Sequence, residues 1–259
     1  MDLLGITEAR FFAFLLVLLR MGALFAFAPV FSTPFVPTQV KAAAVLGLSA
    51  ALTALGFPGE VAVPASAAEL VALGVQELLL GLLIGFIARL VFAAVQFGGQ
   101  LIGFQMGLGI VSVLDPQSET QISVVSQFQF ILAVLLFLAV GGEGMLLEVF
   151  AHNLTAVPPG KPLLTGPLIG AVAHLTGEVF SLGLKLAAPV VAALFASQVL
   201  LGVFARSVPQ MNMLVLGFPL QILVGFTVMG LAVRHWGRAM LHAFSETFEA
   251  LRGLAALLG

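Results

Sequence analysis

The stretch that decides the fold is LVALGVQELLLGLLIGFIARLVFAAVQF, residues 70–97, in which only Glu77 and Arg89 carry charge. An apolar run of about 20 residues is long enough to cross a bilayer as a helix. A strand with an open edge would leave backbone groups unpaired in hydrocarbon, so a helix is the only suitable element here. The stretch therefore predicts a transmembrane helix, and with it an all-α integral membrane protein.

The rest of the chain repeats this pattern. Five further apolar stretches cover residues 11–31, 40–57, 122–140, 168–204 and 211–233. Together the stretches predict a multi-helix protein with six spans. The stretch 168–204 is too long for one span, at about 55 Å of helix, and we expect Pro189 to kink or divide it.

Composition supports a membrane location. The chain has 259 residues, of which 61% are hydrophobic and 8% charged, whereas a soluble domain has about 25% charged residues. There is no cysteine, which excludes disulfides and thiolate metal sites, and tyrosine is also absent. We find no repeat or separate soluble domain. We therefore expect a single membrane domain over residues 1–259, with a C-terminal amphipathic tail at about 234–259.

Several charged residues lie inside the apolar stretches, where each needs a partner, a wet cavity or access to the interface. They are Arg20, Glu69, Glu77, Arg89, Glu178 and Lys185. Glu178 and Lys185 are two helical turns apart, so a secondary ion or solute transporter that uses them with Arg89 is an alternative interpretation. The simpler interpretation is that Lys185 reaches the interface and Glu178 pairs with a neighbouring subunit. We identify no partner for these charges within the chain, and so predict that the protein is not stable alone.

No pattern in the sequence indicates catalysis or a cofactor. The four histidines are scattered, and the chain contains no HExxH, GxSxG or phosphate-binding loop. An intramembrane hydrolase would need a nucleophile and base that we cannot place. We predict a protein that is not an enzyme and that binds no metal or cofactor.

Glycine spacing indicates close helix packing. Gly81 and Gly85 form one GxxxG pair, and Gly99, Gly103 and Gly107 form two overlapping pairs. Glycines four residues apart open a groove in which another helix backbone can lie. Ordinary helix packing explains a single pair equally well. The overlapping pairs are followed by a predicted helix end at Asp115-Pro116.

A polar turn separates the last two apolar stretches. Its sequence is RSVPQMN, residues 206–212. Either it is a connecting loop, or it is a re-entrant turn that partners must cover. In the second case the contacts between subunits would come from Arg206, Pro209, Gln210, Met211 and Asn212.

These passages together resemble the FliR family of flagellar biosynthesis proteins, the export-gate subunit shared with injectisome type III secretion systems. The residues that carry the resemblance are APVF (28–31), VPTQVKAAAVLGLS (36–49), QELLLGLLIGF (76–86), GGQLIGFQMGLGIVSVLDPQ (98–117), LKLAAPVVAALF (184–195) and RSVPQMNMLVLGFPLQILVG (206–225). The family's GGH-like element appears here as Gly141-Gly142-Glu143. Whether the system is flagellar or an injectisome stays open.

The resemblance implies a role in protein export. Family members are subunits of a helical export gate of tilted, kinked hairpins in the bacterial inner membrane, at the flagellar basal body. Their partners are proteins of the FliP, FliQ, FlhB and FlhA families and unfolded substrates. The resemblance also implies a channel plug formed by Gly107, Leu108, Gly109, Ile110, Val111, Ser112, Val113, Leu114, Asp115 and Pro116.

Overall fold

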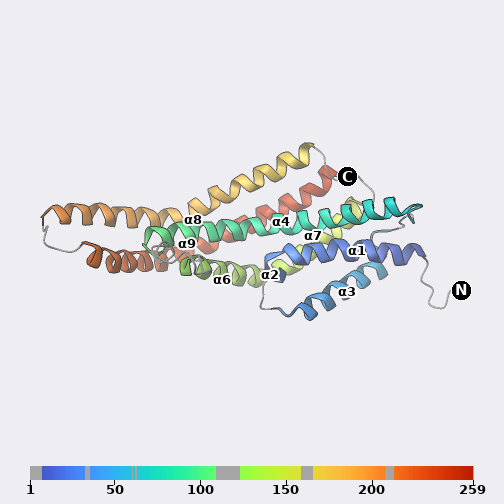
Figure 1. Cartoon of the computed structure of the whole chain (residues 1–259), viewed down its shortest axis with the longest axis horizontal. Coiled ribbons are helices and arrows are strands. Elements are labelled where there is room, and N and C mark those ends of the chain that lie inside the picture. The colour runs from blue at the N-terminus through green and yellow to red at the C-terminus, as the bar shows by residue number, and fades with distance from the viewer. Residues whose placement is uncertain are drawn as a thin grey trace. The chain divides into compact units, whose positions relative to one another are not determined.

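The computed structural model describes residues 8–32, 36–59, 61, 63–108, 123–158, 166–207 and 213–258. Every regular element in these residues is an α-helix (Figure 1). In chain order the helices are α1 (Glu8–Phe27), α2 (Pro29–Ser32), α3 (Thr38–Ala54), α4 (Ala67–Gln105), α6 (Val124–Ala139), α7 (Gly142–Ala156), α8 (Gly166–Ser207) and α9 (Met213–Leu258). The all-α fold class predicted from the sequence is confirmed.

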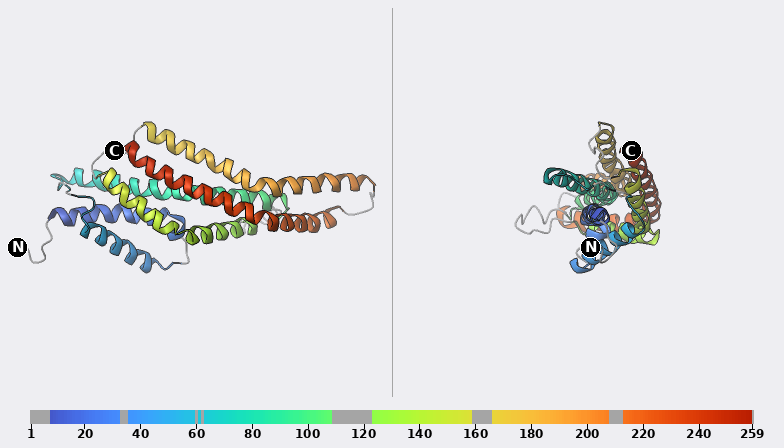
Figure 2. Two further views of the ribbon diagram at one scale, coloured as in Figure 1. Left: turned by 180° about the vertical axis from the view of Figure 1, so that it is seen from behind. Right: turned by 90° about the vertical axis from the view of Figure 1, so that its right-hand side faces the viewer.

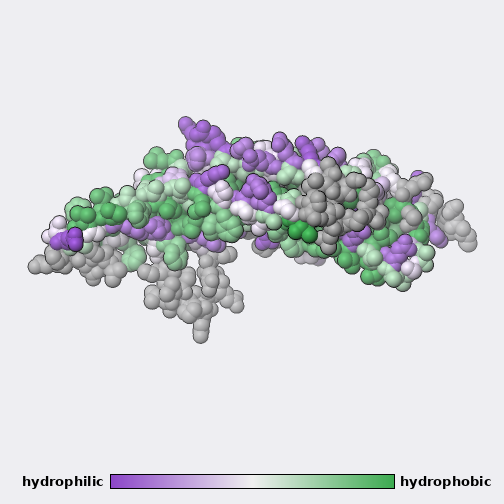
Figure 3. Space-filling model, turned by 90° about the horizontal axis from the view of Figure 1, so that it is seen from above, coloured by the Kyte–Doolittle hydropathy of each residue, from purple (hydrophilic) through white to green (hydrophobic). Residues whose placement is uncertain are grey.

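Four of the described helices, α1, α4, α8 and α9, are long and apolar enough to cross a membrane. Helices α6 and α7 would supply a fifth crossing if they form one broken span. The expected six spans are therefore too many for the described residues. The shortfall lies in α3, whose 17 residues extend about 25 Å, less than the roughly 30 Å of the hydrocarbon core. The surface agrees with a multi-pass membrane protein, since hydrophobic residues cover much of the face in Figure 3.

Pro189 was expected to kink or divide the stretch 168–204, and of these two outcomes the division does not occur. Helix α8 continues through Pro189. Proline removes one backbone donor and crowds the preceding turn, but membrane helices tolerate this where another group supplies a hydrogen bond. The carbonyl oxygen that loses its helical donor at Pro189 is that of Lys185, four residues before it. The next carbonyl oxygen, that of Leu186, accepts from Nε1 of the buried Trp236 indole at 2.8 Å.

The chain forms two compact units. Unit 1 comprises Met1–Leu90, Gly141–Leu175 and Ser245–Gly259, and unit 2 comprises Val91–Val140 and Thr176–Phe244. We describe each unit separately. Residues 234–258, expected as a distinct tail, continue α9 without a break.

The centre of unit 1 contains a buried ion pair. Arg20 of α1 and Glu77 of α4 have fully buried side chains, with Nε–Oε2 at 2.5 Å and Nη2–Oε1 at 2.9 Å. Arg20 Nη1 also donates to Oδ1 of Asn153 at 3.0 Å, and both Nη atoms donate to the carbonyl oxygen of Val157 at 3.1 Å. Arg20 therefore joins α1, α4 and the C-terminal end of α7. The expectation that this charge lacks a partner within the chain is wrong.

Helices α1 and α4 approach closely beside this pair. A methyl group at Gly81 would overlap the carbonyl oxygen of Arg20, and one at Gly85 would lie 2.8 Å from Cβ of Phe27. Helix α3 packs along α1, as both views of Figure 2 allow the reader to follow. These two glycines thus contact a helix of the same chain.

The start of α4 explains another charge in an apolar stretch. The backbone N–H of Glu69 donates to Oγ of Ser66 at 3.2 Å, and Oε2 of Glu69 accepts from the N–H of Ala65 at 2.9 Å. This arrangement closely resembles a capping box, in which two side chains satisfy the free N–H groups at a helix start. Glu69 is exposed and caps the helix.

The core of unit 2 is aromatic. Phe92 of α4 lies 5.6 Å from Phe137 of α6 and 5.3 Å from Phe244 of α9, measured between ring centroids. Helix α8 reaches α4 through two glycines, since a methyl group at Gly98 would lie 2.8 Å from the carbonyl oxygen of Gly183. Phenylalanine packing and close backbone contact thus hold four helices together.

Candidate functional site

The candidate site lies in unit 2 where α4 ends. The N–H of Leu108 donates to the carbonyl oxygen of Gly103, and that of Gly107 to the carbonyl oxygen of Phe104, both at 3.0 Å. This pair of bonds is a Schellman motif, which requires a left-handed residue at the position of Gly107. Gly107 has a φ of +79°, a conformation that glycine adopts without steric cost. The helix therefore ends at Gln105, and its predicted end at Asp115-Pro116 is wrong.

Of the three overlapping glycines, only Gly99 and Gly103 lie within the helix. A methyl group at Gly99 would lie 2.5 Å from Cα of Ser126, and one at Gly103 would overlap the side chain of Ser123. Ser126 also donates from Oγ to the carbonyl oxygen of Gln96 at 2.9 Å. Gly99 and Gly103 thus allow the N-terminal end of α6 to pack closely against α4, whereas Gly107 terminates α4.

A pocket of about 260 Å³ opens beside this helix end. Its lining residues are Phe104, Gln105, Met106 and Gly107 from the end of α4, Gln198 from α8, and Gly217, Phe218 and Gln221 from α9. The lining is neutral, because none of these side chains titrates. The site therefore offers hydrogen-bonding amides and apolar surface but no charge.

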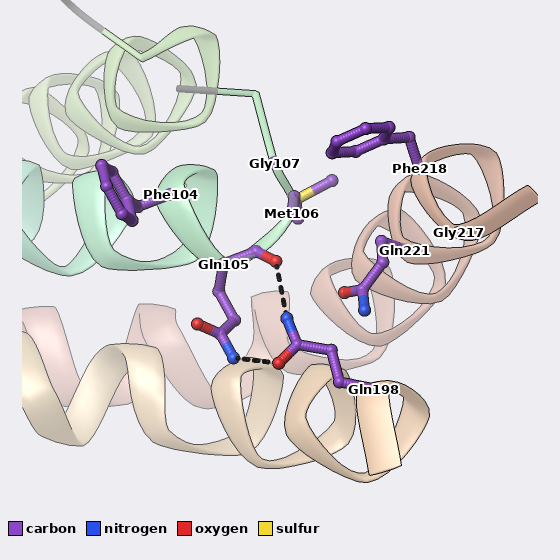
Figure 4. A pocket seen from close by; sticks show the side chains of 8 residues that line it. All are labelled: Phe104, Gln105, Met106, Gly107, Gln198, Gly217, Phe218 and Gln221. Atoms are coloured by element: carbon purple, nitrogen blue, oxygen red, sulfur yellow. Dashed lines mark hydrogen bonds between the residues drawn. The ribbon is translucent and has the colours of Figure 1, made fainter. Parts of the chain in front are cut away.

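Three glutamine amides meet around the pocket, as Figure 4 shows. Gln105 Nε2 donates to Oε1 of Gln198 at 3.2 Å, and Gln198 Nε2 donates to the backbone carbonyl oxygen of Gln105 at 3.5 Å. Gln221 is only 6% exposed, and its Oε1 has no hydrogen-bond partner among the residues that the structure describes. Burying such an acceptor without a donor costs free energy. The site thus holds an unused acceptor.

Sequence comparison places the chain in a known family. Residues 11–247 match the family described as bacterial export proteins, family 1. The chain belongs to this family. It is similar to the flagellar biosynthetic protein FliR of Bacillus subtilis (strain 168), with 34% identity over 95% of this chain and 96% of the relative. It is also similar to FliR of Escherichia coli (strain K12), with 33% identity over 93% and 92%. The resemblance seen in the sequence is confirmed.

The channel plug that the FliR resemblance implies begins at this site, at the C-terminal end of α4. Gly107 and Leu108 are described; the remaining eight residues, Gly109 to Pro116, lie outside the described residues. Gly107 contacts Phe218 of α9 closely, since a methyl group there would lie 2.6 Å from Cε1 of that ring. The start of the predicted plug is therefore packed against α9 within unit 2. Its role in closing a channel stays a prediction.

The polar turn of the export protein is described only at its start. Arg206 is an exposed side chain in the last turn of α8, where a cation is favourable for the helix dipole. Pro209, Gln210, Met211 and Asn212 lie outside the described residues. Contacts of this turn with other subunits stay a prediction.

The residues proposed for ion transport do not form an enclosed path among the described residues of the export protein. Glu178, Lys185 and Arg89 are all exposed side chains. A transport pathway places ionisable groups in the interior of a bundle or a water-filled cavity. The transporter interpretation therefore receives no support from their placement.

Sequence reasoning missed the two polar clusters of this export-family chain. Arg20 and Glu77 stand in the sequence as single charges, and a separation of 57 positions gives no signal that they pair. No pattern in the sequence marks the glutamines of the pocket. The only local signal missed was Ser66 three positions before Glu69, the spacing of a capping box.

Proposed function

We propose that this chain is a non-enzymatic subunit of the flagellar protein export gate, in which residues 107–116 help to close the channel. The observation that carries the proposal is the match to an export family over residues 11–247. Relatives that match over nearly the whole chain are named flagellar biosynthetic proteins. A flagellar gate is therefore favoured over the injectisome, and the bacterial inner membrane is the expected location.

The local chemistry agrees with a plug. The Schellman motif at Gly107 stops α4 and turns the chain away from the helix axis. The segment that follows carries the apolar side chains Ile110, Val111, Val113 and Leu114. An apolar constriction closes a pore by excluding water, and it needs no charged group to do so.

Partner subunits are expected to cover the apolar surface. In the part of the chain that the structure describes, the exposed large side chains include Phe195, Leu200 and Phe204 of α8 and Leu223 and Leu231 of α9. We propose that FliP-family and FliQ-family subunits pack beside this chain. The FlhB-family and FlhA-family proteins would join the same gate and pass unfolded substrates to it.

Deleting Ile110–Leu114 tests the plug. The deletion variant should assemble with its partners, because the glycine contacts of α4 at Gly81, Gly85, Gly99 and Gly103 are unchanged. It should admit ions or a small dye into cells that express the whole gate, since the apolar seal is gone. Leakage and complex assembly would be measured on the same cells.

Gly103→Leu is the matched control. Its side chain would overlap Ser123, so the variant should lose assembly without a specific leak. A deletion variant that assembles fully and stays as tight as wild type would show that this segment does not close the channel. A chain that does not co-purify with FliP-like and FliQ-like proteins would contradict the proposed function as a whole.

A further inference from the structure

The pocket at the end of α4 has a composition that neither helix packing nor a seal requires. A seal needs only apolar side chains, yet Gln105, Gln198 and Gln221 place three amides in an otherwise apolar lining. An amide side chain carries two donors and an acceptor with two lone pairs. Buried polar groups are normally hydrogen-bonded, and an exception calls for a functional explanation.

Gln221 supplies such an exception in the pocket. Other buried atoms without a partner among the described residues, such as both amide atoms of Gln129, do not line it. The side chain of Gln221 is 6% exposed, it lines the pocket, and its Oε1 has no donor within the described part of the chain. The neighbouring amides do not satisfy it: Gln105 and Gln198 bond to each other through long contacts of 3.2 and 3.5 Å. Bonds of this length are near or beyond the limit of the usual range. The amides are therefore able to exchange partners.

The neutral lining defines the class of group that fits. An ion would need an opposite charge or a ring of ligands, and no lining residue carries a charge. A lipid chain would use the apolar side chains but not the amides. A peptide unit has one N–H donor and one carbonyl acceptor, which complements an amide side chain on both sides.

The apolar part of the lining suits a partner of varied sequence. Phe104 is 75% exposed at the rim, and Met106 offers a flexible, polarisable side chain that adapts to differently shaped groups. The volume of about 260 Å³ corresponds to roughly nine water molecules, enough for a short piece of extended backbone. Backbone hydrogen bonds with adaptable apolar contacts give binding that does not depend on sequence.

We propose that this pocket binds the peptide backbone of the exported polypeptide as it passes the end of α4. The inference rests on the proposed export function. It goes beyond that function by assigning a substrate contact to Gln221, Gln198 and Gln105. Gln221 Oε1 accepts a substrate N–H, and the Gln105–Gln198 pair opens to bond the next peptide group.

A site-specific photo-crosslinker tests the contact directly. In the test variant, benzoylphenylalanine would replace Phe104 at the rim of the pocket. In the matched control it would replace Phe128, which is 49% exposed on α6 and does not line the pocket. A tagged export substrate fused to a tightly folded domain would be stalled in the assembled gate. We expect a crosslink to the substrate from position 104 and none from position 128.

Gln221→Met provides the functional readout. It keeps the side-chain size but removes the acceptor. We expect export to slow by about fivefold, the effect of losing about one hydrogen bond. Because the contact is to backbone, two substrates of unrelated sequence should slow by the same factor, while the amount of assembled gate stays constant.

Each other outcome overturns the inference. A crosslink from position 104 to another gate subunit would make the pocket an assembly contact, and a product without protein would make it a lipid site. If the export of only one of the two substrates slows, the pocket recognises substrate side chains and not the backbone. These experiments are interpreted only if the wild-type gate assembles and exports its substrate. Absence of assembly or export in the wild type would contradict the proposed function itself, and not the inference about the pocket.

Discussion

Two polar clusters of this chain are built in opposite ways: the first is fully buried, whereas only Gln221 of the second is buried. In unit 1, Arg20 and Glu77 carry full charges, and the guanidinium is bonded to a carboxylate, an amide and a backbone carbonyl. In unit 2, the three amides are neutral: Gln105 and Gln198 are joined by long bonds. Gln221 carries an acceptor for which the described residues provide no donor. The first cluster binds three helices of its own unit, whereas the second keeps capacity for a partner.

The difference teaches where to look for function in an apolar chain. A buried charge must be satisfied by the fold itself, because leaving it unpaired costs too much. Leaving a buried amide partly unpaired costs less free energy than leaving a charge unpaired. Such an amide can therefore remain available for a transient partner. Charge in the apolar stretches thus indicates structure in this chain, and neutral polarity near a helix end indicates the candidate site.

The largest expected effect comes from breaking the charged cluster. Arg20→Ala leaves Glu77 buried without its cation, which typically costs about 3–5 kcal/mol. We expect the chain to be degraded in cells or, if recovered, to unfold at a much lower temperature by calorimetry of the purified gate.

The double variant Arg20→Met with Glu77→Leu is the control for this prediction. Removing both charges often restores much of the lost stability, although the carbonyl of Val157 loses its donor. Recovery above the single variant is expected. If the double variant is no better than Arg20→Ala, the carbonyl contacts at the end of α7 matter more than the ion pair.

A smaller effect is expected inside unit 2, from Trp236→Phe. The change keeps an aromatic ring but removes the donor to the carbonyl of Leu186, at a cost of about 1–3 kcal/mol. Denaturation followed by circular dichroism would measure it. The cost should be the same in a Pro189→Ala background, because the carbonyl that lacks a helical donor at Pro189 belongs to Lys185 and not to Leu186. A smaller cost in that background would show that the bond compensates for the proline.

The smallest effect is expected at an ion pair on the surface of unit 1. Arg252 Nη2 lies 3.0 Å from Oε1 of Glu148, and the two side chains are 49% and 67% exposed. Such a pair contributes about 0–1 kcal/mol and is screened by salt. Arg252→Ala should change the unfolding temperature of the gate little at low salt and not at all at high salt. A loss comparable to that of Arg20→Ala would break the comparison between buried and exposed charge.

The sequence predicted the helical membrane fold because apolar length alone decides it. Helix ends were harder, since two glycines with positive φ set them. Gly56, with a φ of +92°, and Gly107 both close helices through the same pair of backbone bonds. In the sequence Gly107 continues the four-residue spacing of Gly99 and Gly103, which indicates helix packing and not a helix end. Asp115-Pro116 was therefore the stronger indication of where the helix ends.

The candidate site could be predicted only in part. The resemblance marked the region that begins at Gly107, but the amides beside it come from three helices. Gln105 and Gln198 are 93 positions apart, and no spacing rule connects them. The same holds for Arg20 and Glu77, whose pairing depends on how α1 crosses α4. Long-range pairs of this kind arise from tertiary packing, which a local pattern does not encode.

The bond between Trp236 and Leu186 also gives the chain an intrinsic optical probe. Trp236 is the only tryptophan, and there is no tyrosine, so the near-ultraviolet emission of the isolated chain comes almost entirely from one indole. That indole is fully buried and hydrogen-bonded between α9 and α8. Its emission colour and its accessibility to quenchers therefore report the packing of these two helices, with no dye attached and no residue replaced.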